Sequence, residues 1–371
     1  MKKYLFIAAA AVIALASCQK ETEVPSFNNV PGVMNEISLR SASGVTKSAI
    51  DGTTFPVGYD MLVSAYRNLD ESIKGDDSAA DYFEGIHFEK GTSDAVWHAK
   101  TPKYWPLTGK LDFLAVACAG LNTADNGIVP TCTWGASSNV AKQVVVTVPD
   151  NSAKFDDLLY GAANAQSYVA SGTPISFNHA MAAVVFTAKS NVAYDTTTNV
   201  GITIDSISVN GAKYSGTLTV SNPAAAAGSG SLSAAWSDLN TQKDYLKARV
   251  WNSANLGTNT SETELTGLNL TATSAAITTK KFGEGYVILP AQAAVPFTVT
   301  YTIHNGFKSD GTTKLDNQLQ YKYEPTGNWD MAKKYVYDIN ITLNEITIAP
   351  LIVDWDNQTA VDVPIKQVEP N

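Results

Sequence analysis

The side chains that could do chemistry in this chain are few and far apart. Its 371 residues include four histidines, which are isolated from one another: His87, His98, His179 and His304. Cys118 and Cys132 form no CxxC pair, so the spacing supports no zinc site. Asp156 and Asp157 are adjacent, and neighbouring strand residues point to opposite faces, so they make no acid/base pair. With no GxSxG elbow and no phosphate-binding glycine loop, the sequence predicts neither an enzyme nor a metal or cofactor site.

Cys18 predicts a covalent modification. It follows an apolar run over residues 4–16, preceded by two lysines, which is too short to span a bilayer and is typical of a signal peptide. Leu15-Ala16-Ser17-Cys18 resembles the bacterial lipobox, whose cysteine is acylated and becomes the first mature residue. We therefore predict a signal peptide over 1–17 and a lipidated tether over 18–34 that anchors the chain to the outer membrane. The alternative is an ordinary signal peptide with an incidental cysteine.

Export also bears on the other two cysteines. An oxidising compartment permits a disulfide that closes the loop between Cys118 and Cys132. Two free or buried thiols fit the sequence equally well, so the pairing stays open.

The composition predicts an acidic chain built from strands. Only 16% of the residues are charged and the net charge is -9, whereas soluble domains average roughly 25% charged residues. This acidity makes nucleic acid and anionic headgroups poor partners. A hydrophobic content of 44% excludes disorder over most of the length. Thr, Ser, Asn, Val, Tyr and Gly are common and favour strands and turns.

Short apolar or aromatic runs alternate with turn signals such as Asn210-Gly211 and Asn305-Gly306. The first strand is expected over residues 36–40. The later runs are 61–66, 111–118, 143–148, 182–188, 200–209, 214–220, 285–289 and 297–303. Such a pattern is typical of β-sandwiches. Only residues 224–239 read as a loop insert with about one helical turn.

The length predicts two domains. The boundary is expected near Ala170-Ser171-Gly172, which gives an N-terminal β-sandwich over 35–170 and a C-terminal one over 171–371.

Three groups of motifs resemble one known family. They are Trp97 with Tyr104-Trp105-Pro106 and residues 111–115, residues 157–161 with 175–182, and residues 335–341 with Val353-Asp354-Trp355. In this order, and behind a lipobox, they resemble the fimbrillin (type V pilin) family of Bacteroidetes. The resemblance implies an all-β fold of two tandem transthyretin-like β-sandwich domains, to which the composition adds minor helical inserts.

The resemblance also implies how such a chain assembles. In the family, a trypsin-like protease cuts the loop after the first strand, so the strand over 36–40, with Ile37 and Leu39, is displaced. The matching basic residue here is Lys47, with Arg40 second. Relatives carry arginine at this position, so the lysine argues against an arginine-specific protease and leaves one that accepts either basic residue. The alternative is that Lys47 and Arg40 are ordinary solvated residues.

The C-terminal tail, about residues 356–371, is the expected donor strand. Val361, Val363, Ile365 and Val368 supply its apolar side chains, as a strand that fills a groove requires. Pro364 has no N–H and must face away from the acceptor strand or mark a bulge. The alternative is a final edge strand folded onto its own domain.

Together these observations predict a structural subunit of a surface pilus that mediates adhesion, located at the outer membrane and in the fimbrium. Its partners are other copies or related pilin subunits joined head to tail, the trypsin-like protease, host or bacterial surface receptors, and outer-membrane lipid. The alternatives are an anchor or tip subunit of the same pilus, and a monomeric lipoprotein that binds glycans. Exposure of Trp97, Trp105 and Trp134 in one concave patch would favour the glycan-binding alternative.

Overall fold

The computed structural model shows an all-β chain. It describes residues 35–41, 59–68, 81–90, 96–106, 109–119, 131–137, 141–148, 157–222, 231–241, 246–249, 268–269, 275–276, 286–354 and 360–361. Within these ranges there is no helix, so the expected helical inserts have no counterpart there. No described segment therefore forms a helix long and apolar enough to cross a membrane.

The N-terminal sheet closes into a barrel. Its strands are, in spatial order, β1 (Ser38–Ser41), β4 (Trp97–Ala99), β3 (Asp81–Lys90), β2 (Tyr59–Asn68), β5 (Lys110–Ala119), β8 (Leu159–Gln166) and β9 (Thr173–His179). All neighbours are antiparallel except β1 and β9, which are parallel. The short strand β1 closes the barrel because it pairs with β4 on one side and β9 on the other. Apolar side chains fill the interior, which we call the barrel core.

A four-stranded sheet packs on the outside of this barrel. Its order is β13 (Ser233–Thr241), β12 (Lys213–Asn222), β7 (Ala141–Val148) and β6 (Thr131–Ser137). Leu114 and Val116 of β5 meet Leu218 and Val220 of β12 in a second cluster, the intersheet core. Strand β5 is therefore buried on both faces, which explains its unbroken apolar run.

The expected helical turn within residues 224–239 is wrong over its second half. Residues 233–239 belong to β13, and Leu232, Ala234 and Trp236 all pack against the intersheet core. Packing of every second residue is typical of a strand, and the pairing with β12 shows that residues 233–239 form one.

The C-terminal strands form a sandwich. One sheet has the order β16 (Ala275–Ala276), β10 (Met181–Ser190), β22 (Lys333–Ile341), β23 (Ile346–Asp354) and β24 (Ala360–Val361), with β17 (Tyr286–Pro290) also on β10. The other has the order β14 (Leu246–Arg249), β11 (Val200–Val209), β19 (Phe297–Phe307) and β20 (Lys314–Tyr323), with β15 (Leu268–Asn269) also on β11. β18 (Gln292–Ala293) and β21 (Asn328–Trp329) pair separately.

Aromatic side chains dominate the core of this sandwich. Phe186, Phe297 and Tyr337 pack with ring centroids 4.9–5.8 Å apart, distances at which aromatic rings attract one another. The buried Trp329 donates its indole N–H to the Tyr337 hydroxyl at 3.0 Å. The two sheets are thus joined mainly by apolar and aromatic packing.

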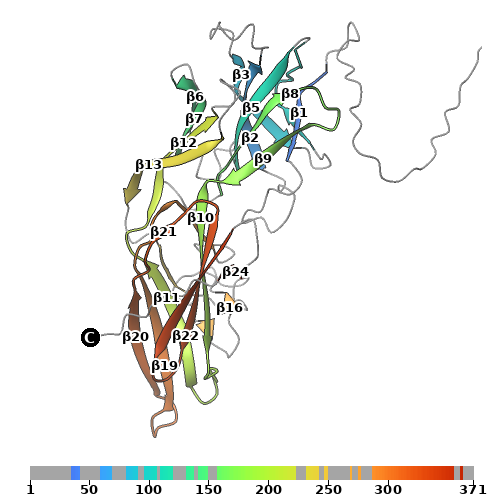
Figure 1. Ribbon diagram of the computed structural model, residues 1–371. Coiled ribbons are helices and arrows are strands. Elements are labelled where there is room, and N and C mark those ends of the chain that lie inside the picture. Colours follow the sequence, from blue (N-terminus) through green and yellow to red (C-terminus); the bar gives the residue numbers. More distant parts are fainter. Residues whose placement is uncertain are drawn as a thin grey trace, which may run out of the picture.

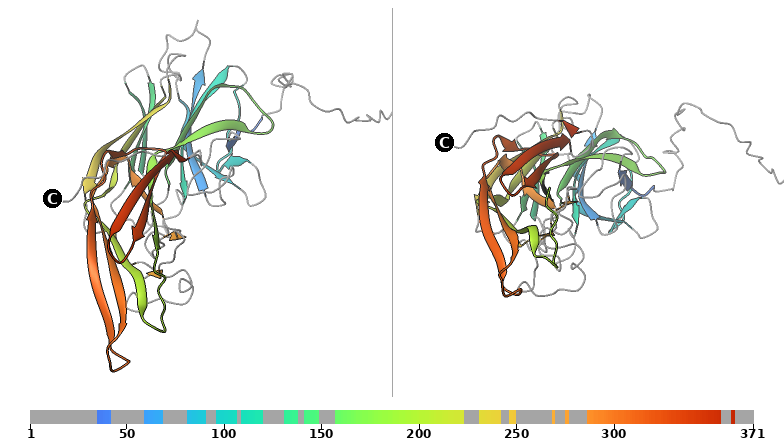
Figure 2. Two further views of the ribbon diagram at one scale, coloured as in Figure 1. Left: turned by 60° about the horizontal axis from the view of Figure 1, so that its bottom comes forward. Right: turned by 90° about the horizontal axis from the view of Figure 1, so that it is seen from below.

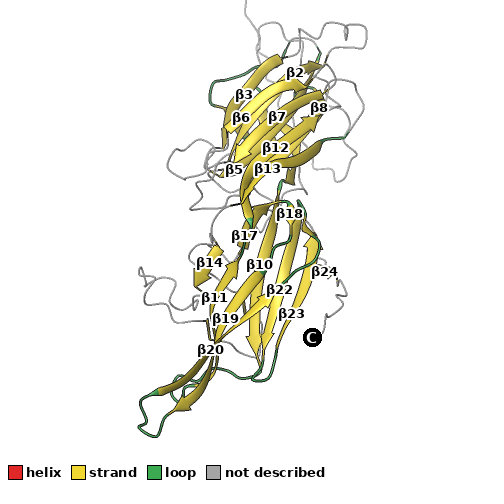
Figure 3. Cartoon of the chain, turned by 90° about the vertical axis from the view of Figure 1, so that its left-hand side faces the viewer, coloured by secondary structure: helices red, strands yellow, loops and turns green. Residues whose placement is uncertain are grey.

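The two bodies lie end to end, with the barrel above and the C-terminal sandwich below in Figure 1 and again in the side view of Figure 3. Viewed from below in Figure 2, the barrel strands and the C-terminal strands are offset to opposite sides. The sheets interleave along the chain: the expected boundary after residue 170 falls between β8 and β9, which are paired neighbours. Strands β12 and β13 also join the N-terminal body, although they follow β10 and β11.

Candidate functional site

Residues 35–41 lie between two other segments of the barrel, one on each side. On one side, the Ile37 N–H donates to the Lys103 carbonyl at 2.7 Å, and Leu39 pairs with Trp97. On the other side, residues 39–41 pair in parallel with Thr173–Ile175. We call this position, bounded by residues 97–105 and 172–175, the first-strand slot.

Two side chains of the strand point into the barrel. Ile37 and Leu39 are both 0% exposed, and they belong to the barrel core together with Trp97, Ile175 and Phe177. Fully burying one such aliphatic side chain contributes about 1.5–3 kcal/mol. The occupant of the slot therefore completes the hydrophobic core as well as the sheet.

The remaining side chains of the strand make polar contacts at each end of the slot. A Glu36 carboxylate oxygen lies 3.5 Å from the His98 Nδ1. At the other end, the Arg40 Nε donates to the Gly172 carbonyl at 3.2 Å. Gly172 has a φ of +85°, and a Cβ there would lie 2.9 Å from the Val96 side chain, so glycine is required for this close approach.

The two predicted processing residues differ in setting. Arg40 lies inside β1, half-buried and opposite Pro174, so a protease could reach its peptide bond only after the strand leaves the slot. Lys47 lies outside the described residues, as does the lipidation residue Cys18.

The predicted donor tail is described only at its start. Ala360 and Val361 form β24, which pairs with Val353 and Ile352 of β23. These two residues therefore form an edge strand on the chain's own domain, which is the alternative to a donor strand. Val363, Ile365 and Val368 lie outside the described residues.

Neither Cys118 nor Cys132 forms a disulfide, which is one of the two states that the sequence left open. Cys118 lies in the intersheet core and Cys132 packs against it. Burial raises the pKa of the Cys132 thiol to about 12, which keeps it in the unreactive protonated form near neutral pH.

His179 is a buried, hydrogen-bonded histidine. Its Nδ1 lies 2.7 Å from a carboxylate oxygen of Asp157, and both side chains are closed to solvent. This pair lies where β9 passes into β10. Among the described residues, no group of three His, Cys, Asp or Glu side chains could hold a metal ion.

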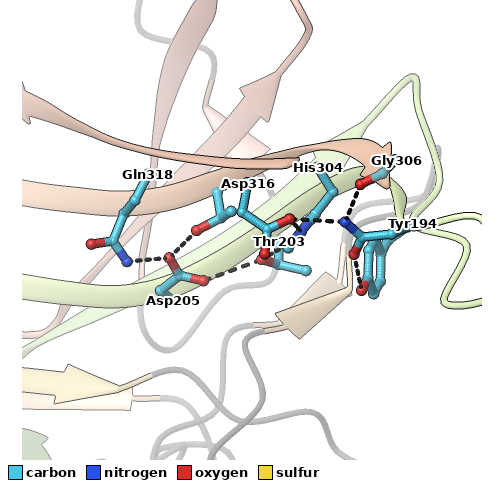
Figure 4. A network of polar contacts seen from close by, with 9 residues as sticks. Tyr194, Thr203, Asp205, His304, Gly306, Asp316 and Gln318 are labelled. Carbon is cyan, nitrogen blue, oxygen red and sulfur yellow. Dashed lines mark hydrogen bonds and ion pairs between the residues drawn. The ribbon is translucent and has the colours of Figure 1, made fainter. Parts of the chain in front are cut away.

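A polar network covers part of the sheet that contains β11, β19 and β20 (Figure 4). Asp205 accepts hydrogen bonds from Thr203, Thr302 and Gln318. Its neighbour His304 bonds to Thr203 and to Asp316. These side chains satisfy one another, so we assign the network to holding the three strands in register.

Asp316 is linked through this network to a loop. Asn199 donates one hydrogen bond to Asp316 at 2.9 Å and one to the Gly306 carbonyl at 3.0 Å. Burial acts to raise the pKa of Asp316, but the hydrogen bonds from Asn199 and His304 outweigh it and hold that pKa below its usual range. The ionised form of Asp316 therefore stabilises this end of the sandwich.

The three tryptophans that the glycan-binding alternative needs do not form one exposed patch. Trp97 is 1% exposed inside the barrel core. Trp105 packs edge-on against Phe113, with ring centroids 5.8 Å apart. Trp134 packs against the intersheet core on the opposite side of β5. Full burial of Trp97 and partial burial of Trp105 and Trp134 favour a structural role for the three side chains.

Sequence reasoning missed one wall of the slot. Thr173–Ile175 and Gly172 were assigned to the second domain, although they flank the first strand. His98 was noted only as an isolated histidine. The one available signal was Gly172-Thr173-Pro174, because a glycine followed by a strand with proline suggests close backbone approach at a sheet edge.

The geometry defines a two-body, all-β protein whose N-terminal barrel is closed by one short strand. Residues 52–355 match the family described as fimbrillin-like, and the chain belongs to this family. No curated protein matches the chain. Fimbrillin-like family membership also agrees with the prediction that the chain is not an enzyme.

A solved structure shares the fold. A fimbrial protein from Bacteroides vulgatus aligns with a TM-score of 0.54 and 15% identity, over 86% of this chain and 99% of that one. A protein described as a cell adhesion protein, from Bacteroides uniformis, aligns with a TM-score of 0.43 and 14% identity, over 86% and 98% of the two chains.

Proposed function

We propose that the chain is a structural subunit of a surface fimbria that polymerises by protease-triggered donor-strand exchange and mediates adhesion. The observation that carries this proposal is the first-strand slot. A short strand closes the barrel there, and it belongs to a segment that a single cut could separate from the rest of the fold. The fold shared with the fimbrial protein of Bacteroides vulgatus also supports the proposal.

Export and anchoring come first in the proposed sequence of events. The precursor is delivered to the outer membrane and held there by acyl chains on Cys18. In this form the first strand fills the slot, so the subunit cannot accept a partner's strand there.

Cleavage then opens the barrel. We propose Lys47 as the processed residue, because Arg40 is paired within β1 and its side chain is bonded to Gly172. Once cut, residues 36–40 are tied to the fold only by contacts in the slot. Their departure leaves unpaired edges on β4 and β9, and an apolar groove where Ile37 and Leu39 lay.

A neighbouring subunit's tail refills the slot. Residues 362–371 follow β24, and ten extended residues reach about 33 Å. Insertion would restore backbone pairing and apolar burial together, which is the general mode of strand addition to an open edge. The contact is head to tail and need not close, so it generates a filament of copies or related pilin subunits.

The test uses purified precursor and a trypsin-like protease. Treatment should produce a ladder of SDS-resistant oligomers on gels, and deletion of residues 356–371 should abolish it. Lys47→Gln, with Arg40 intact, is the matched control and should stay monomeric. A ladder that persists without the tail, or no ladder from fully cut protein, would reject the mechanism.

A further inference from the structure

Two five-residue segments near opposite ends of the chain share one order of side-chain types. Residues 36–40 read Glu-Ile-Ser-Leu-Arg, and residues 362–366 read Asp-Val-Pro-Ile-Lys. Each runs acidic, apolar, small or proline, apolar, basic from the N-terminal end. The first segment is the strand that fills the slot, and the second lies in the proposed donor tail.

We propose that residues 362–366 of a neighbouring subunit enter the first-strand slot in the same direction as residues 36–40 and in a single register. Val363 takes the place of Ile37, and Ile365 takes the place of Leu39. The inserted strand is then antiparallel to β4 and parallel to β9. This inference rests on the proposed donor-strand exchange and specifies its geometry.

The apolar positions of the slot exclude one neighbouring register. The slot encloses two side chains completely, those of Ile37 and Leu39. A shift that puts Ile365 in the place of Ile37 puts Gln367 in the place of Leu39. Its amide would then lie in the barrel core, where an unpaired polar group is costly.

Pro364 excludes the opposite shift. Pro174 of β9 has no N–H, so the parallel pairing opposite it must use the N–H and carbonyl of Arg40. A register that places Val361 and Val363 in the two apolar positions would put Pro364 in the place of Arg40. That register loses the hydrogen bond which Arg40 donates through its N–H.

The proposed register puts Pro364 where a proline is tolerated. Ile37 donates its N–H toward Lys103, and successive N–H groups of a strand point to opposite edges. The Ser38 N–H therefore points toward the β9 side, where pairing begins only at Leu39. A proline in the place of Ser38 breaks no pairing that the described strand makes.

Charge complementarity fixes the direction. In the proposed register Asp362 takes the place of Glu36, which lies 3.5 Å from His98. Lys366 takes the place of Arg40, whose side chain donates to the Gly172 carbonyl. The reverse direction would bring Lys366 toward His98 and a carboxylate toward a carbonyl oxygen.

Disulfide trapping tests the register directly. Ser38 lies opposite His98, and cross-strand Cα atoms at such non-hydrogen-bonded positions are about 4.5 Å apart, within the range for a disulfide. The acceptor is a cut subunit lacking residues 356–371 and carrying His98→Cys. The donors are uncut chains carrying Asp362→Cys, Pro364→Cys or Lys366→Cys, whose own slots are filled. Acceptors that retain His98 control for the native cysteines.

The proposal expects oxidised dimer from Pro364→Cys at a level at least tenfold above the other two donors. Stronger trapping at position 362 or 366, or equal trapping at all three, overturns the register. Size-exclusion chromatography of wild-type donor with acceptor separates the two ideas. If a complex forms but traps at the wrong position, the register alone is refuted. If donor and acceptor form no complex at all, donor-strand exchange is refuted and the register with it.

Discussion

Replacing Leu39 with alanine should loosen the first strand selectively. Its side chain is fully buried in the barrel core, and its backbone pairs with Trp97 of β4 and Thr173 of β9. Truncating a buried leucine to alanine costs about 2–5 kcal/mol, and a loss of about 3 kcal/mol changes an equilibrium constant roughly 100-fold. We therefore expect the cut strand of Leu39→Ala to bind the slot about 100-fold more weakly than the wild-type strand.

The assay follows strand release in subunits that cannot refill the slot. A chain lacking residues 356–371 carries a fluorescent label at its N-terminus and is cut by a trypsin-like protease. The anisotropy of the label falls as the strand dissociates. Ser38→Ala is the matched control, because Ser38 is half-buried and is not part of the barrel core. Substitutions of this kind usually change stability by less than about 0.5 kcal/mol.

Comparison of the two variants shows whether burial of the Leu39 side chain holds the strand in the slot. Similar release from Leu39→Ala and Ser38→Ala, with both within about threefold of wild type, would refute the reasoning. The strand would then be held by backbone pairing or by contacts at its ends, and apolar burial would not control its exchange.

Three further predictions concern processing, the thiols and the acidic network. Lys47→Gln should block the protease-triggered ladder while Arg40→Gln leaves the cut site unchanged, and mass spectrometry of the fragments would reveal any cut at residue 40 that contradicts this. At pH 8 a thiol reagent should leave Cys118 and Cys132 unmodified in native protein and modify both in urea, because neither is in a disulfide, both pack in or against the intersheet core, and burial raises the pKa of Cys132 to about 12; rapid labelling of the native protein would contradict this prediction. The lowered pKa of Asp316 adds stability that is complete above its unfolded pKa of about 3.9 and is lost as pH falls through the lower folded value. The melting temperature of wild type should therefore fall more than that of Asp316→Asn between pH 5 and pH 2, and parallel curves would count against the network.

The sequence predicted part of the set of strands but missed others, such as β3 and β20, and it did not predict all of the strand partners. Every run expected to form a strand overlaps one in the structure, because alternation and turn residues act locally. Asn210-Gly211 forms the expected turn, with Gly211 at a φ of +80°. Asn305-Gly306 instead lies within β19, where a register shift accommodates Gly306 and its N–H donates to Asn199.

The first-strand slot shows why the partners of some strands could not be predicted from the sequence. The apolar character of Ile37 and Leu39 indicates a buried strand, but Arg40 and Gly172 are 132 residues apart. Parallel pairing over such a distance has no connecting turn and hence no local signal. Likewise, β13 followed a segment rich in glycine and alanine, and only its pairing with β12 shows that it is a strand.

Mass spectrometry of subunits from sheared surface filaments tests the central claim most directly. If the chain assembles by donor-strand exchange after cleavage at Lys47, the polymerised subunit begins at Ser48 and contains no residue of the first strand. Filament subunits that retain residues 36–40, or that still begin at an acylated Cys18 throughout the polymer, would contradict the account.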